Sequence, residues 1–456
     1  MSVDGVKRAK FDNEIPVVVK QNFETSVNCN GNGLCFNYDV NSPMCPSYKA
    51  TKDRRNSPKG RAGLMREWLR LQGDNVEKLR DTNIFTKVLS TINKVRGKYD
   101  FSHEVKQSMD LCLACKACTT ACPIKVDVPT FRAKFLTLYH QRYLRPLSDH
   151  LVANVESIIP KLAKFPRLAN LIAFNPISNW VTRNVIGYVD APRFSGAITS
   201  YVSKQHWYNP NELNALTELE KSKFVLLVQD PFTSFYEGQL VQDTITALER
   251  LGFQPRVLPF TANGKAAHVK GFINKFKNTA SKTTEYLNQA AKHNVAMIGL
   301  DASLVFAYRD EYVKELGTEK VKFDVSVLSE WLAQQDLSKV KAETKFNQYK
   351  LIAHCTEKSL MADVNAQWDH IFGQLNIPLT PISAGCCGMA GTFGHEKANQ
   401  IVSKDLYQAS WEDKVTEHKE TLLATGFSCR SQVKRFSQHS VLHPIQVIAS
   451  LTTHQK

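Results

Sequence analysis

Apolar residues recur at helical spacing through the first third of the chain. Ser57 and Pro58 fit an N-cap and a first helical turn, and Leu64 and Trp68 follow on one face, which predicts a helix to about residue 72. Further helices are expected over 75–95, over 103–111, from Pro129 towards Pro146, and in short pieces over 148–190. The first part of the chain is therefore expected to be mainly helical.

From residue 224 the pattern changes to short, continuous apolar runs separated by amphipathic stretches. Such runs are typical of strands buried in a parallel sheet. Strands are predicted at 224–229, 256–260, 295–300, 350–353, 378–382 and 421–425. Helices are predicted at 238–251, 266–277, 325–335, 361–374, 396–411 and 443–452. This alternation implies parallel sheets joined by right-handed crossovers.

The second part also contains a diverged repeat. LLVQDPF and LERLGFQPRVLPF parallel LIAHCTE and FGQLNIPLTPI in element order and spacing. The second copy carries cysteines where the first has Phe232 and the stretch 261–264. We therefore expect the second copy to keep a metal-type site while the first serves packing.

Composition and charge exclude several classes of protein. The 456 residues suffice for two or three domains, and 43% hydrophobic with 22% charged residues exclude a disordered or fibrous chain. No apolar run is long enough to cross a membrane, and the first residues lack a secretory signal, so a cytoplasmic location is expected. The net charge of +15 could suit nucleic acid, a membrane surface or an acidic substrate. The densest basic run, Lys49–Arg61, fits a solvated loop or a docking surface.

The 11 cysteines are the most informative residues. In a reducing compartment, clusters of cysteine are more often metal ligands or redox groups than disulfides. Cys112 to Pro123 form a C-x2-C-x2-C-x3-C-P run, the spacing of bacterial ferredoxins, which predicts a [4Fe–4S] cluster. In that pattern the fourth cysteine, Cys122, serves a different cluster, so the missing ligand is expected to be Cys45, which also precedes a proline.

A second cluster site would have only three thiols, from Cys29, Cys35 and Cys122, because Asn32 stands at the middle position of the upstream run. Three thiolates could hold a [3Fe–4S] cluster, a cubane with a non-cysteine ligand, or nothing.

Four further cysteines gather near the C-terminal end. Adjacent cysteines between glycines favour a metal or iron–sulfur site, with a zinc site or an empty remnant as the alternatives. The candidate ligands are Cys355, Cys386, Cys387 and Cys429. His395 could add a ligand or a supporting hydrogen bond, and His354 fits a packed histidine better.

These motifs resemble those of a known group of enzymes. CNGNGLCFNYDVNSPMCPSYKATKDRRNSPKGRAGLMREWLR and SAGCCGMAGTFGHE are similar to the iron–sulfur half of large bacterial FAD-linked D-2-hydroxyglutarate dehydrogenases. The iron–sulfur subunits of glycolate oxidase and of anaerobic glycerol-3-phosphate dehydrogenase are more distant matches. No nucleotide-binding glycine motif and no nucleophile elbow accompany them.

The resemblance implies an oxidoreductase module that passes electrons from a reduced flavin through its clusters to an acceptor such as a quinone. FAD and substrate would bind to a flavin half outside this chain, either fused to it or a separate subunit, so no catalytic residue is expected here. Contact with the inner membrane surface and self-association stay open, and no nucleic-acid partner is expected. The family's cysteine set ends with a C-x2-C pair, but in this chain Gln432 stands where the cysteine after Cys429 would be. In the first copy, Leu304 stands where that pair would begin.

The fold class expected from all of this is α+β and multidomain, a helical ferredoxin-like domain followed by a duplicated α/β domain of the Cys-Cys-Gly type with parallel sheets. The expected divisions are a lead-in or linker at 1–28, a helical iron–sulfur domain at 29–145, a helical connector at 146–222, a degenerate first repeat at 223–345 and a second repeat with the cysteine cluster at 346–456.

Three other functions compete with this interpretation. The first is the iron–sulfur subunit of a glycolate, lactate or glycerol-3-phosphate oxidising complex. The second is a zinc-organised binding module without redox activity, which leaves the ferredoxin spacing unexplained. The third is a heterodisulfide-type catalyst, against which the missing fifth thiol argues.

Overall fold

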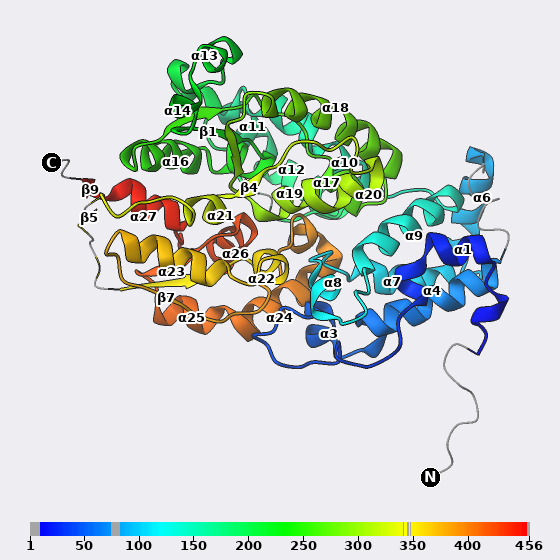
Figure 1. Cartoon of the computed structure of the whole chain (residues 1–456). Coiled ribbons are helices and arrows are strands. Elements are labelled where there is room, and N and C mark those ends of the chain that lie inside the picture. The colour runs from blue at the N-terminus through cyan, green and yellow to red at the C-terminus, as the bar shows by residue number, and fades with distance from the viewer. Residues whose placement is uncertain are drawn as a thin grey trace.

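The computed structural model describes residues 10–73, 83–190, 192–340, 342–343, 346 and 348–453. Its N-terminal part is a helical lobe, coloured blue to cyan in Figure 1. The helices of this lobe are η1 (Asp12–Glu14), α1 (Val17–Asn22), α2 (Glu24–Val27), α3 (Pro46–Thr51), η2 (Arg54–Asn56), α4 (Pro58–Gln72), α6 (Ile84–Val95), α7 (Ser102–Asp110), α8 (Ala117–Ala121) and α9 (Val128–Arg142).

The core of this lobe is built where α4, α7 and α9 meet. Trp68 packs edge-on against Phe135 with their ring centroids 5.1 Å apart, and both side chains are buried. Residues 10–28 were expected to be a lead-in, but they form η1, α1 and α2 and bury Val19 and Phe23 in the same core. The short apolar stretch around Val19 therefore belongs to the lobe.

A string of short helices links the lobe to the sheets. It comprises α10 (Leu147–Leu162), α11 (Pro166–Ala173), α12 (Pro176–Val181), the π-helical turn η4 (Thr182–Ile186), η5 (Ile198–Ser200), η6 (Lys204–His206), α13 (Pro210–Asn214) and α14 (Glu218–Lys221). Asparagine side chains cap two of these helices, α12 and α13; Asn175, for example, accepts a hydrogen bond from the Ser178 N–H at 2.9 Å.

The first sheet has the strand order β2-β1-β3-β4, with every pair parallel. Its strands are β1 (Phe224–Val228), β2 (Gln254–Val257), β3 (Ala296–Gly299) and β4 (Ser326–Val327). The helices around it are α15 (Pro231–Tyr236), α16 (Gly238–Arg250), α17 (Lys265–Val269), α18 (Ile273–Ala291), α19 (Ala302–Ala307), the π-helical turn η7 (Tyr308–Tyr312), α20 (Val313–Leu316) and α21 (Leu328–Leu332). All five residues of β1 are buried, as the continuous apolar run predicts.

The second sheet has the parallel order β7-β6-β8. Its strands are β6 (Tyr349–Ile352), β7 (Leu379–Pro381) and β8 (Leu422–Ala424), and a separate antiparallel pair joins β5 (Ala342–Glu343) to β9 (Thr452–Thr453). The helices of this region are α22 (Cys355–Leu360), α23 (Val364–Gln374), η8 (Phe393–His395), η9 (Lys397–Asn399), α24 (Gln400–Ser410), α25 (Glu412–Glu417), α26 (Phe427–Ser437) and α27 (Pro444–Ser450). In both sheets the first strand in sequence lies between the second and the third.

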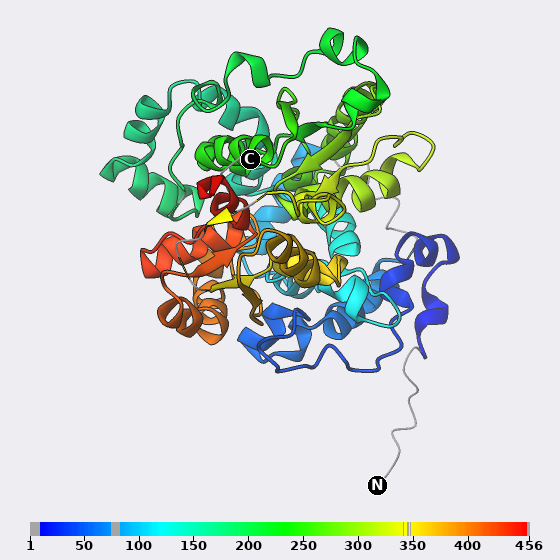
Figure 2. The same cartoon turned by 60° about the vertical axis from the view of Figure 1, so that its left-hand side comes forward.

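The two sheet regions share one apolar core, which contains Val225 of β1 and Leu351 of β6. The last helix, α27, packs on α16, and Arg250 donates hydrogen bonds to the carbonyls of Ala449 and Leu451. The helical lobe lies against the second sheet region, where α3 contacts α24 and α8 contacts α22. Figures 1 and 2 show these blue and cyan helices beside the yellow and orange elements.

Several element boundaries differ from the sequence predictions. The helix expected at 266–277 is two helices, because the backbone of Gly271 is left-handed, with φ +70°. Gly271 also packs closely on α9: a Cβ atom at this position would lie 2.7 Å from the Cβ of Leu136. The stretch 325–335 begins with β4 before α21, and the helix expected at 396–411 begins only at residue 400, after two 3-10 turns. Residues 74–82, part of the helix expected at 75–95, lie outside the described residues. The helix that follows β8 and carries Cys429 was missed.

Across the described part of the chain, each helix is too short or too polar to span a lipid bilayer.

Candidate metal centres

The ferredoxin-spaced cysteines lie in the loop between α7 and α9. Ala114 and Lys116 both adopt left-handed backbone, with φ of 52° and 63°, so the chain turns twice within the motif. These turns bring Cys112, Cys115 and Cys118 together: Cys112 raises the pKa of both other thiols, and Cys115 raises that of Cys118. Burial is the largest cause of the raised pKa of the Cys115 and Cys118 thiols, so both are protonated when nothing neutralises the thiolate.

Cys45 completes this group from α3. It has left-handed backbone (φ 42°) and is followed by Pro46 at the first position of the helix. Its pKa is raised first by burial and also by the neighbouring Cys112. Its Sγ lies 3.3 Å from the carbonyl oxygen of Asn56 and accepts a hydrogen bond from Arg61 Nη1 at 3.7 Å. The expected set of Cys45, Cys112, Cys115 and Cys118 is therefore gathered in one place.

Arg61 is a residue of this site that sequence reasoning missed. It is 1% exposed, and it donates hydrogen bonds to the Ser108 carbonyl and to Ser47 Oγ, both at 2.9 Å. A buried guanidinium that faces a thiol supplies the positive charge that a thiolate needs. Nothing in its spacing within α4 distinguishes Arg61 from the other basic residues around it.

The second set is less compact. Cys35 lies near Cys29 and Cys45, and its Sγ accepts a hydrogen bond from the Lys59 N–H at 3.4 Å. Cys122 packs in the same apolar core as Cys29 and Cys35. Asn32, the residue at the position of the absent cysteine, is exposed, and its Oδ1 accepts a hydrogen bond from the Leu34 N–H at 3.0 Å.

The third set lies at the carboxyl edge of the second sheet, where parallel strands commonly present functional groups. Cys355 follows β6 at the start of α22, Cys386 and Cys387 follow β7, and Cys429 lies in α26 after β8. Thiol hydrogen bonds connect Cys355 to Cys386, Cys386 to Cys387, and Cys387 to Cys429. All four predicted C-terminal residues therefore converge.

One thiol of this set has the character of a thiolate. A hydrogen bond from Cys386 and the charge of His354 hold the pKa of Cys355 well below its ordinary value, against the effect of burial. Burial disfavours a charged imidazole, but the Cys355 thiolate beside it raises the pKa of His354 to about 9. His354 therefore acts on a cysteine, beyond the packing role expected for it. His395 is not part of the set, because its Nδ1 lies 3.2 Å from the Val189 carbonyl and burial lowers its pKa to about 4.

The glycines around the Cys386–Cys387 pair leave room for the backbone of neighbouring segments. A Cβ atom on Gly385 would lie 1.9 Å from the carbonyl oxygen of Val40, and one on Gly388 would lie 2.3 Å from that of Ser403. We expected these glycines to let the backbone approach a cluster. The structure shows that they let the helical lobe and α24 approach the cysteine loop.

The first and third sets adjoin. After burial, Cys355 makes the largest contribution to the raised pKa of Cys115. The helices beside them, α8 and α22, are in contact. A cavity of about 100 Å³ between them is lined by residues that include Cys112, Cys115 and Cys355. Phe232 also lines this cavity and stacks on Phe427 with ring centroids 5.2 Å apart, so the first sheet region contributes packing here.

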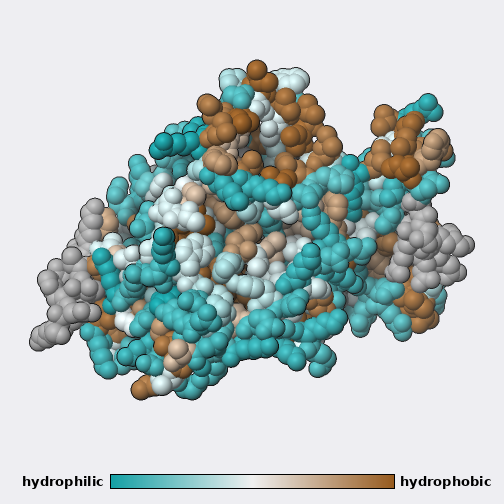
Figure 3. All heavy atoms as spheres, turned by 90° about the horizontal axis from the view of Figure 1, so that it is seen from above, coloured by the Kyte–Doolittle hydropathy of each residue, from teal (hydrophilic) through white to brown (hydrophobic). Residues whose placement is uncertain are grey.

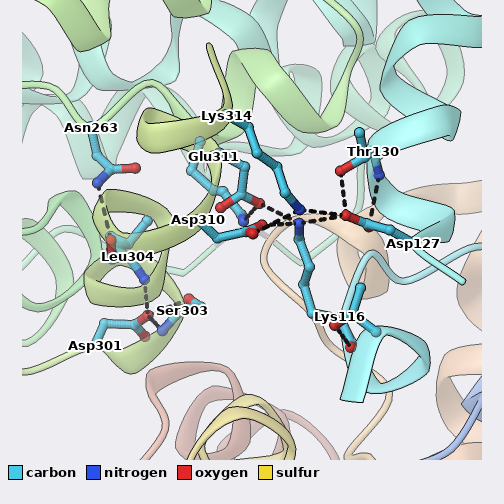
Figure 4. A network of polar contacts seen from close by, with 12 residues as sticks. Lys116, Asp127, Thr130, Asn263, Asp301, Ser303, Leu304, Asp310, Glu311 and Lys314 are labelled. Atoms are coloured by element: carbon cyan, nitrogen blue, oxygen red, sulfur yellow. Dashed lines mark hydrogen bonds and ion pairs between the residues drawn. The ribbon is translucent and has the colours of Figure 1, made fainter. Parts of the chain in front are cut away.

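A buried ion network fixes the ferredoxin-spaced loop to the first sheet region (Figure 4). Lys116, between two of the motif cysteines, forms ion pairs with Asp127, Asp310 and Glu311, and it is 4% exposed. Burial works against the charge of Lys116, but Glu311 and Asp127 raise its pKa above the ordinary value. Lys116 lowers the pKa of Asp127, against its burial, to about 2. Sequence reasoning missed this network because its members are far apart in the chain.

The donor sets suit clusters better than single ions. None of the cysteines forms a disulfide. Within the described ranges, no three His, Cys, Asp or Glu side chains converge closely enough to hold one metal ion. In an iron–sulfur cluster each thiolate binds its own iron, which spreads the sulfurs further apart than a shared ion does. Buried thiols, left-handed turns and a neighbouring cavity fit such a group at the first and third sets.

Comparison with known proteins gives an independent result. Residues 26–126 match the family described as "4Fe-4S dicluster domain". The chain is 22% identical to one of the subunits of anaerobic glycerol-3-phosphate dehydrogenase of Escherichia coli (strain K12), over 75% of this chain and 98% of that protein. It is 20% identical to the glycolate oxidase iron-sulfur subunit of the same strain, over 91% of this chain and 92% of that protein. No solved structure matches the chain.

A higher similarity is to D-2-hydroxyglutarate dehydrogenase of Escherichia coli (strain K12), which is 46% identical over 99% of this chain. The chain covers 46% of that protein, so it spans slightly less than half the length of the dehydrogenases that it matches. The chain is thus similar, over nearly its whole length, to one part of the bacterial D-2-hydroxyglutarate dehydrogenases, and its residues 26–126 match the 4Fe-4S dicluster family.

Proposed function

We propose that this chain is the electron-transfer iron–sulfur module of a flavin-dependent D-2-hydroxyacid dehydrogenase, with D-2-hydroxyglutarate as the substrate of the whole enzyme. The observation that carries the proposal is the convergence of Cys45 with the ferredoxin-spaced Cys112, Cys115 and Cys118. The 46% identity to D-2-hydroxyglutarate dehydrogenase over 99% of the chain supports the choice of substrate.

We assign one [4Fe–4S] cluster to these four cysteines and a second, three-thiol cluster to Cys29, Cys35 and Cys122. The C-terminal set, Cys355, Cys386, Cys387 and Cys429, is assigned a third redox group. A bound cluster exchanges one electron at a time, which divides the two-electron oxidation of a hydroxyacid into single steps. Arg61 faces Cys45 and balances thiolate charge, and the buried apolar residues around the thiols exclude water.

The adjoining first and third sets suggest the order of transfer. FAD, on a half outside this chain, would deliver electrons to the lobe clusters. The C-terminal set, whose Cys355 acts electrostatically on Cys115, then offers the next site, on the way to an acceptor such as a quinone. We also propose that the two α/β regions, divided near residue 346, are copies of one unit, since their first three strands have the same spatial order.

The test begins with anaerobic purification of the chain. We expect a brown protein with iron and sulfide in near-equal amounts and an EPR signal after reduction by dithionite. Mixed with a flavin-containing half, the clusters should be reduced by D-2-hydroxyglutarate and far more slowly by the L enantiomer. A colourless protein that contains zinc after strictly anaerobic preparation would contradict the proposal.

A second candidate is the iron–sulfur subunit of a glycolate, lactate or glycerol-3-phosphate dehydrogenase complex. The observation that favours it is that the chain covers 98% and 92% of the two distantly related subunits. Cluster reduction by glycolate or glycerol 3-phosphate, but not by D-2-hydroxyglutarate, in the same mixture would select this alternative.

A further inference from the structure

The helices α11, α12 and η4 present apolar side chains to solvent. Between residues 166 and 186 the only buried residue is Ala169. Leu171 is 71%, Ile177 77% and Trp180 62% exposed. Each exposed apolar residue lies three or four positions from another; they are Leu162, Phe165, Leu168, Leu171, Ile172, Ile177, Trp180, Val181 and Val185. This segment is therefore an amphipathic surface whose apolar face lies outside the core.

The helix α6 repeats this arrangement. It contains no buried residue, and Phe85 is 84% exposed. The other exposed apolar residues of α6 are Ile84, Val88, Leu89, Ile92 and Val95. Seen from above in Figure 3, brown apolar residues gather in a large patch at the upper middle and a smaller one at the upper right, which the positions of α11, α12 and α6 in Figure 1 identify. Both patches lie along the same edge of the molecule, and we name α6 with the segment 162–186 the apolar–basic edge.

The charged residues of this edge have one sign. With the residues that flank it, the edge covers 84–98 and 161–193, which together contain nine Lys or Arg residues and one acid, Asp190. That acid forms an ion pair with Arg435 at 2.8 Å, so it does not neutralise the edge. Several of the basic residues are exposed beside the apolar stripe: Arg96, Lys161, Lys164, Arg167 and Arg183.

This combination selects the kind of partner. A second copy of the chain would bring a surface of the same positive charge against this one, which like-charge repulsion disfavours. An anionic bilayer offers both an apolar interior for leucine, isoleucine and tryptophan and negative headgroups for lysine and arginine. Exposed apolar patches of this extent mark interaction sites. We propose that the apolar–basic edge binds the surface of an anionic lipid membrane, with α6, α11 and α12 lying in the plane of the headgroups.

The test uses flotation of the whole chain with lipid vesicles. With vesicles of mixed phosphatidylglycerol and phosphatidylcholine we expect binding at least tenfold tighter than with phosphatidylcholine alone, and weaker binding as salt is raised. The triple variant Leu171→Gln, Ile177→Gln, Trp180→Gln should bind at least tenfold more weakly. Because these side chains are exposed, the variant should keep its thermal unfolding midpoint and iron content.

The matched control is Leu219→Gln, which removes an equally exposed apolar residue of α14, outside the segments of the edge. It should bind as the unaltered chain does. The proposal is overturned if the unaltered chain does not float with anionic vesicles, or if the control loses as much binding as the triple variant. It is also overturned if the triple substitution abolishes a concentration-dependent increase in mass instead, which would make the edge a contact between copies. Iron content and reduction by D-2-hydroxyglutarate are separate measurements, so this proposal can fail while the proposed function stands.

Discussion

Lys116 Nζ lies 3.5 Å from the Oε1 of Glu311, although the two residues belong to the helical lobe and to the first sheet region. Glu311 is 2% exposed and also pairs with Lys265. Lys265 and Lys116 hold the pKa of Glu311 well below its ordinary value, against the effect of burial. The loop that carries four predicted cluster ligands is therefore fastened from outside its own lobe.

Removing one carboxylate from this network should destabilise the protein. In Glu311→Gln, Lys116 and Lys265 lose a buried partner, and breaking a buried ion pair in this way costs about 3–5 kcal/mol. Unfolding in urea should show this loss, while Glu319→Gln, at an exposed position of the same region, should change stability by no more than about 0.5 kcal/mol. Equal stability of the two variants would mean that the network does not hold the loop.

Substitution of alanine for two glycines of α4 should change the free energy of unfolding in opposite directions. A Cβ atom on Gly60 would lie 2.0 Å from the Arg54 carbonyl oxygen and 2.7 Å from the Arg55 Cα, both backbone atoms of η2. Gly60→Ala should therefore lower the free energy of unfolding by about 3 kcal/mol or more. Gly63 has no neighbour within 4 Å of such an atom, so Gly63→Ala should raise it by about 0.5–1 kcal/mol. If Gly63→Ala were less stable than the unaltered chain, room for a Cβ atom would not be what decides the effect of alanine at these positions.

Glu156 should make stability depend on pH. Burial raises its pKa to about 7, although it accepts a hydrogen bond from the Gly264 N–H at 2.6 Å. In the unfolded chain this carboxyl has its ordinary pKa of about 4.5, so the folded state holds the proton more tightly. The free energy of unfolding therefore falls as the pH rises from about 4.5 to about 7. From pH 5 to pH 8 the unaltered chain should lose roughly 2–3 kcal/mol more than Glu156→Gln. Parallel pH profiles of the two proteins in urea unfolding would show that Glu156 is ionised when folded.

Cys115→Ser tests the assignment of the first cluster. Serine replaces a thiolate by a hard, weakly basic oxygen, so iron and sulfide should fall by the share of one cluster and one EPR signal should disappear. Thr120→Ser, in the same loop, should retain both. Unchanged iron content in Cys115→Ser would contradict the ligand assignment.

Local signals allowed the loop, the buried strands and the capped helix α4 to be predicted from the sequence, because short-range spacing determines each of them. The break at Gly271 was missed because its cause lies in the packing of α9, which the local pattern does not show. Residues 10–28 were expected to be a lead-in, since α1 and α2 are too short to show a period. Likewise, the electrostatic effect of Cys355 on Cys115 depends on how the lobe docks on the second sheet region, which local patterns do not show.

The packing of Val40 on Gly385 also bears on the order of events during synthesis. A chain that emerges from the ribosome can gather Cys45 with the Cys112–Cys118 loop once α9 has left the exit tunnel. Its Lys116 then waits, unpaired with Asp310 and Glu311, until the first sheet region follows. Only when β7 and α24 emerge does Gly385 meet the loop around Val40. The four thiols of the lobe can thus gather before the chain is complete, whereas the C-terminal cysteines come together only after nearly all of it has been made.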